Sequence, residues 1–151
     1  MPQSYSCLYT HLVFATKRRA PLISSSIQAR LYAYMRAIIQ DCKCHPLAVG
    51  GMPDHIHILT SLSREISTST LLREIKAHSS GWIHRTFSSL PHFNWQDGYG
   101  AFSISHSDIE KVRTYIKNQT KHHSRMSFAE EFESLLSEQS IEYEPRYLWK
   151  E

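Results

Sequence analysis

Two histidines alternate with aliphatic residues in the segment 53–59 (PDHIHIL). This period of two is typical of a β-strand, in which successive side chains point to opposite faces. Ile56 and Ile58 would then face a core, and the histidines would share the other face. Along that strand His55 and His57 would lie about 7 Å apart, close enough to bind one divalent ion. A half-exposed strand whose polar face carries histidine by chance is the other interpretation, and a metal site would need a third ligand from elsewhere.

Length and composition favour one compact domain. The chain has 151 residues, of which 41% are hydrophobic, which suits a single core spanning 1–151. Its net charge of +3 permits a phosphate-rich partner without requiring one. Three cysteines are an odd number and no secretory segment is visible, so we expect a cytoplasmic protein without a disulfide framework. No apolar run reaches membrane-spanning length, so we expect no membrane partner.

Hydrophobic periodicity along the chain predicts alternating strands and helices. Apolar side chains at three- and four-residue steps indicate helices, and alternation indicates strands. Serines with Gln or Glu three residues later predict capping boxes at Ser25, Ser107 and Ser127. The predicted elements are a strand 5–16, a helix after 24–26, a hairpin 43–59 turning around 50–53, a helix 68–85, a strand 99–105 and a helix from 107.

This order, strand-helix-strand-strand-helix-strand (βαββαβ), is that of a ferredoxin-like α+β domain. We expect a mostly antiparallel sheet with the two histidines near its centre and helices covering one face. The helix that begins at 107 lies outside this unit but within a core of about 5–123, and a C-terminal helical tail, 124–151, follows.

Two groups of basic residues are candidate phosphate contacts. Lys17, Arg18 and Arg19 follow the first strand, and Arg73 and Lys76 lie on one face of the second helix. Solvated surface charge is an equally good interpretation of both groups.

A third ligand could come from the helix that begins near 107. Ile109, Val112 and Ile116 form its apolar stripe, and Tyr115 and Gln119, four residues apart, share a neighbouring face. Taken alone, the tyrosine reads as a partly buried aromatic and the glutamine as a surface residue.

Together these residues resemble the single-tyrosine HUH transposases of small bacterial insertion sequences (IS200-like transposases). The shared marks are His55-Ile56-His57 on a strand and, some sixty residues later, Tyr115-x-x-x-Gln119 on a helix. The stretches 54–59, 75–82 and 95–103 are also similar to the family, and the resemblance covers roughly 5–123.

The resemblance implies a transposase that cuts and rejoins single-stranded DNA at hairpin ends. His55, His57 and Gln119 would hold Mg²⁺ or Mn²⁺, and Tyr115 would attack phosphorus to form a 5′-phosphotyrosine. It also implies a homodimer in which each subunit donates Tyr115 and Gln119 to the other. Two alternatives stay open: a non-catalytic ferredoxin-like nucleic-acid-binding module, and a metal-dependent phosphodiesterase that activates water.

Overall fold

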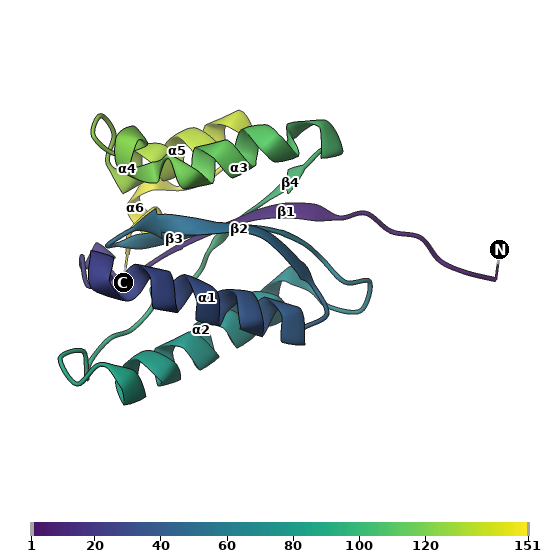
Figure 1. Ribbon diagram of the computed structural model, residues 1–151. Coiled ribbons are helices and arrows are strands. Elements are labelled where there is room, and N and C mark those ends of the chain that lie inside the picture. Colours follow the sequence, from purple (N-terminus) through teal and green to yellow (C-terminus); the bar gives the residue numbers. More distant parts are fainter. Residues whose placement is uncertain (1, 151) are drawn as a thin grey trace.

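The computed structural model describes residues 2–150 and centres on a four-stranded antiparallel sheet in the order β2-β3-β1-β4 (Figure 1). The histidine strand β3 lies between β1 and β2, as predicted. The elements follow the predicted βαββαβ order, so the ferredoxin-like α+β fold is confirmed. The strands are β1 (Tyr9–Ala15), β2 (His45–Met52), β3 (His55–Ser61) and β4 (Gly100–Ile104).

Helices cover both faces of the sheet rather than one (Figure 1). One face packs against α1 (Ser25–Asp41) and α2 (Thr68–Thr86) in the main core, which includes Ile56 and Ile58. The other face, which carries the histidines, is covered by α3 (Ile109–Lys117) and α5 (Phe128–Glu138). The short helices α4 (Gln119–His122) and α6 (Pro145–Leu148) complete this second layer. Because α5 belongs to the predicted tail, the tail is packed on the sheet.

The β2–β3 hairpin turns at Pro53-Asp54, two residues beyond the predicted centre of the turn. Gly50 and Gly51 instead belong to β2 and pair with His57 and Ile56. A Cβ at Gly50 would lie 2.8 Å from the carbonyl oxygen of Ile116. The missing side chain therefore lets α3, the helix that carries the tyrosine, approach the sheet closely.

Two of the three predicted capping boxes are absent. Helix α1 begins one residue early, after Ser24, and the Gln28 amide donates to the Ile23 carbonyl instead of closing a box on Ser25. Helix α3 begins at Ile109 after the 3₁₀ turn η2 (His106–Asp108), so Ser107 caps nothing. Ser24, not Ser25, is the residue that precedes α1, and Ser107 lies inside the 3₁₀ turn that precedes α3.

At α5 Ser127 is the N-cap, as predicted, but the box is half formed, because the Glu130 carboxylate accepts from the Ser127 hydroxyl and not from the Ser127 backbone N–H. The Ser127 hydroxyl accepts from the Glu130 backbone N–H at 3.2 Å and donates to the Glu130 carboxylate.

The first strand starts at Tyr9, later than the predicted residue 5. Within residues 2–150, none of the helices has the length and apolar character needed to cross a membrane.

Candidate active site

His55 and His57 are fully buried on the second face of the sheet, which rules out the half-exposed strand. Each ring is oriented through its Nδ1 atom. His55 Nδ1 donates to the Asp54 carboxylate at 2.7 Å, and His57 Nδ1 lies 2.8 Å from His11 Nε2 on β1. Both Nε2 atoms therefore face the helical layer, where a further ligand could meet them.

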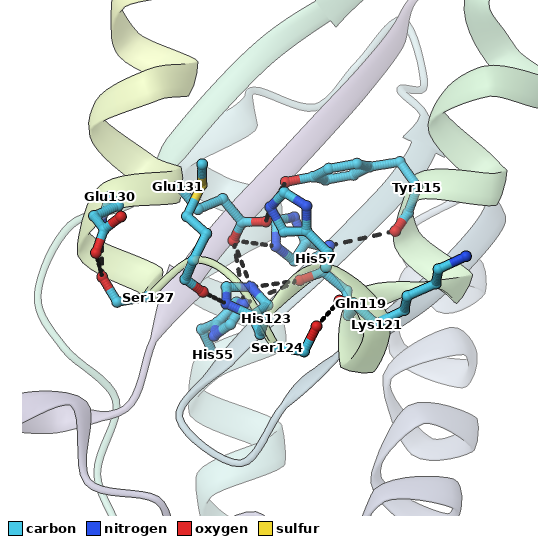
Figure 2. Close-up of polar contacts among 12 residues, drawn as sticks. His55, His57, Tyr115, Gln119, Lys121, His123, Ser124, Ser127, Glu130 and Glu131 are labelled. Atoms are coloured by element: carbon cyan, nitrogen blue, oxygen red, sulfur yellow. Dashed lines mark hydrogen bonds and ion pairs between the residues drawn. The ribbon is translucent and has the colours of Figure 1, made fainter.

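Gln119 reaches the histidines, as the sequence predicted. Helix α3 ends at Lys117 and α4 begins at Gln119, whose side chain is 1% exposed. Its Oε1 atom lies 3.2 Å from His55 Nε2 and 2.9 Å from His123 Nε2 (Figure 2). All of these groups belong to one chain in this structure.

Glu131 on α5 occupies the centre of the cluster, and sequence analysis missed it. Its Oε1 atom lies 3.0 Å from His57 Nε2, 3.3 Å from His55 Nε2 and 3.1 Å from His123 Nε2 (Figure 2). The candidate ligand atoms of His55, His57, His123 and Glu131 all lie within 4.8 Å of one another. The described residues therefore include a group able to hold a divalent ion.

A signal for Glu131 was present in the sequence. The buried face of α5 carries Phe128, Glu131 and Leu135 at steps of three and four, so the carboxylate interrupts an apolar stripe. A charged residue at such a position is almost never fully buried unless it is paired. His123 had no comparable signal, because it lies in a turn between helices.

The pKa shifts in the cluster follow from burial and from these contacts. Burial alone would raise the pKa of Glu131, but hydrogen bonds from His55 and His57 outweigh it and hold that pKa far below its usual range. Burial lowers the pKa of His57, and burial together with His57 lowers the pKa of His11 to about 3. For His55, the partners Asp54 and Glu131 overcome burial and raise the pKa. His57 and His11 are thus neutral at pH 7, and neutral imidazole is the form that binds metal.

The Tyr115 hydroxyl points into the same cluster. It donates a short hydrogen bond to the Glu131 carboxylate and lies 3.4 Å from His122 Nε2. Burial and the hydrogen bond to Glu131 raise the pKa of Tyr115, so the phenol is protonated at neutral pH. The predicted nucleophile, the predicted ligands and an acidic group therefore meet at one point.

Surface cavities reach Tyr115 from outside. A cavity of about 480 Å³ is lined by Tyr115, Asn118, Lys121 and Arg125, with His122 and Met126. A second, of about 450 Å³, extends from Tyr115 past Glu131 to Phe102 on β4. An anionic ligand could thus approach the hydroxyl between two cations.

The predicted basic contacts lie at several places. Lys17, Arg18 and Arg19 form the 3₁₀ turn η1 after β1, and the Arg19 guanidinium lies 4.5 Å above the Trp149 ring. Arg73 is exposed on α2, across the sheet from the histidines. The Lys76 ammonium donates to the carbonyls of residues 96 and 98, at 2.9 and 2.6 Å. Lys76 thus supports the loop before β4, and DNA contact by all five residues stays a prediction.

We expect Glu131→Gln to destabilise the metal-free protein by about 3 kcal/mol at pH 7, because it removes the charge that pairs with several buried imidazoles. The folded-state pKa of Glu131 lies below its ordinary value of 4.5. The carboxylate's contribution is therefore present above about pH 4.5 and declines as pH falls below it. Urea unfolding in chelator at pH 7 and pH 4 should show a smaller difference from wild type at the lower pH.

Glu138→Gln, at an exposed position of the same helix, is the matched control and should change stability by less than about 0.5 kcal/mol. An unfolding free energy for Glu131→Gln equal to that of the control would mean that the carboxylate does not hold the cluster together.

Comparison with known proteins supports the resemblance. The chain is 26% identical over 120 residues to the transposase for insertion sequence element IS200 of Salmonella typhimurium, covering 76% of this chain and 78% of that protein. It is 21% identical over 117 residues to the ISDra2 transposase TnpA of Deinococcus radiodurans, covering 72% and 81% of the two chains.

Two solved structures share the fold. A transposase candidate from Deinococcus radiodurans superimposes with a TM-score of 0.64 at 24% identity, over 77% of this chain and 93% of the other. A REP-associated tyrosine transposase bound to a REP hairpin gives a TM-score of 0.60 at 20% identity, over 80% and 72%.

A family model, described as transposase IS200 like, matches residues 4–119, which include His55, His57, Tyr115 and Gln119. His123 and Glu131 lie beyond the matched segment. The match spans more than half of the sequence, and the chain therefore belongs to the IS200-like transposase family.

Proposed function

We propose that this transposase cuts and rejoins single-stranded DNA through a covalent bond between Tyr115 and a 5′-phosphate, assisted by a divalent ion. One observation carries the proposal: the Tyr115 hydroxyl and the side chains of His55, His57 and Gln119 converge in one buried cluster. A non-catalytic DNA-binding module would have no need for this convergence.

The donor atoms in the cluster fit a divalent ion. His55, His57 and Gln119 would hold Mg²⁺ or Mn²⁺, and His123 and Glu131 lie close enough to contribute. Of the two ions, a set rich in imidazole suits Mn²⁺ better, because Mg²⁺ prefers oxygen ligands and retains water. Bound there, the ion would neutralise charge on the scissile phosphate and stabilise the leaving oxygen.

The protein itself would position the nucleophile. In the proposed step the Tyr115 oxygen forms a bond to phosphorus and the bond from phosphorus to the 3′-oxygen breaks. The 3′-oxygen takes up a proton from solvent and leaves as a 3′-hydroxyl. Glu131 already accepts the Tyr115 hydrogen bond, so its carboxylate is the nearest acceptor for the phenolic proton. A second 3′-hydroxyl could reverse the attack, because the phosphotyrosine link is itself a phosphodiester.

The substrate we propose is a single-stranded DNA hairpin with unpaired flanks. The solved relative that binds a REP hairpin supports this choice. Lys121 and Arg125, which line the cavity at Tyr115, would neutralise backbone phosphates near the reacting group. We further propose a homodimer that exchanges Tyr115 and Gln119 between subunits, as an alternative to the arrangement within one chain described above.

The test is to incubate the protein with Mn²⁺ and a pool of labelled hairpins whose single-stranded flanks are randomised. A DNA adduct that survives denaturing electrophoresis, together with a free 3′-hydroxyl, is the expected result. Cleavage without an adduct would identify a phosphodiesterase that activates water. Binding with neither product would identify a non-catalytic module.

We expect Arg73→Ala to weaken hairpin binding and to lower the slope of log affinity against log salt by about one unit. Lys76→Ala should also weaken binding, but it removes two hydrogen bonds to the loop before β4 as well, so Arg73 is the cleaner test. Lys43→Ala, at an exposed basic position two residues beyond the end of α1, is the control. If the salt slope for Arg73→Ala equals that of wild type, Arg73 is a solvated surface residue and does not contact DNA phosphate.

A further inference from the structure

A cavity of about 270 Å³ lies between the loop before β4 and the end of the tail, beside the histidine cluster. Its wall at Phe128 is shared with the active site, because this ring stacks on His55 with centroids 4.3 Å apart. Its lining is rich in aromatic rings, namely Phe14, Tyr99, Phe128, Phe132, Tyr147 and Trp149.

Cations surround this aromatic cavity. The Arg19 guanidinium lies 4.5 Å above the Trp149 ring, and the Arg146 guanidinium lies 4.8 Å above the Tyr147 ring. Lys76 donates to the carbonyls of two lining residues, at 2.6 and 2.9 Å. Proteins bind single-stranded nucleic acid with this combination of stacking rings and positive charge.

One part of the lining is polar and acidic. Gln96 and Asp97 face the cavity from the loop before β4, and the Asp97 side chain is exposed. Adenine, cytosine and guanine each carry an exocyclic amine that can donate a hydrogen bond to a carboxylate, whereas thymine has no exocyclic amine. An acidic group would repel a phosphate, so the charge pattern suits a base inside the cavity and phosphates outside it.

We propose that this cavity binds one unpaired nucleobase of the DNA strand that passes the active site, with Tyr99 stacking on the base and Asp97 accepting from its amine. The inference rests on the proposed function and specifies how the substrate strand is held. It assigns the tail a role in substrate recognition, because Tyr147 and Trp149 supply part of the cavity.

The test uses the full chain carrying Tyr115→Phe, which should bind DNA without cutting it. Anisotropy is measured with a hairpin whose single-stranded flank carries one abasic site at each position in turn. We expect one position at which base removal weakens binding roughly tenfold, since stacking of a base on an aromatic side chain is worth about 1–3 kcal/mol. Tyr99→Ala, at a ring that is 43% exposed, should weaken binding of intact DNA about as much but leave the abasic DNA unaffected.

Tyr5→Ala, at a tyrosine that is 77% exposed near the start of the chain, is the matched control and should bind both DNAs like the parent. At the sensitive position, thymine should bind more weakly than the three amine-bearing bases, and Asp97→Ala, which removes the acceptor, should remove this difference. The inference is overturned if no position is sensitive, or if Tyr99→Ala weakens intact and abasic DNA equally. Adduct formation by wild type is scored separately, so a failed cavity with an intact adduct is distinguishable from failed chemistry with an intact cavity.

Discussion

Tyr115→Phe is expected to abolish the covalent DNA adduct while folding and DNA binding persist. The change removes one oxygen and keeps the ring, so the only group lost is the proposed nucleophile. It also removes the hydrogen bond to Glu131, which should lower stability by about 1–3 kcal/mol. Denaturing gels with labelled DNA and Mn²⁺ measure the adduct, and anisotropy measures binding.

Tyr34→Phe is the matched control, because Tyr34 stacks on Trp82 on the other side of the sheet, 4.9 Å between ring centroids. It should form the adduct at the wild-type rate. If Tyr115→Phe still cuts DNA without an adduct, a water-activating nuclease becomes the better account of the site.

The same variant distinguishes sites built within one chain from sites shared between subunits. Differently tagged Tyr115→Phe and His55→Ala chains can be co-expressed and isolated as mixed dimers. If helices are exchanged, one hybrid site combines an intact tyrosine with intact histidines, and some activity returns. Inactive mixed dimers beside an active wild-type dimer would favour the arrangement within one chain seen in this structure.

His55→Ala and His57→Ala should each reduce cleavage below detection while hairpin binding largely survives. Each removes one imidazole whose Nε2 atom lies within 3.3 Å of Glu131 in the cluster. With one ligand lost, an ion would be held too weakly to neutralise the phosphate at the working concentration. Calorimetric titration with Mn²⁺ should show weaker binding in step with the lost cleavage.

His78→Ala is the control, because this histidine is exposed on α2 and its Nε2 atom pairs with Glu74, away from the cluster. Each variant's thermal unfolding is compared first, because removal of a buried imidazole also leaves Glu131 with one partner fewer. Undiminished cleavage by both variants, in protein shown to be folded, would remove the metal site from the mechanism.

The sequence by itself determined the fold and four residues of the candidate site, namely His55, His57, Tyr115 and Gln119. Alternation over 55–59 places both histidines on one side of a buried strand. The four-residue step between Tyr115 and Gln119 predicted that both reach the histidines, although the helix predicted to carry both is interrupted at Asn118, between α3 and α4. These features depend on residues close together in the chain, so local periodicity is enough to predict them. The Ser127 N-cap was predictable for the same reason.

Only the tertiary structure decided which other groups join the cluster. Glu131 lies 74 residues from His57, and it reaches the histidine only because α5 packs on the second face of the sheet. His11 meets His57 through the register of β1 against β3, in which Val13 is the residue that faces His57. Such contacts depend on how separate elements pack against one another. No spacing within a single strand or helix encodes them.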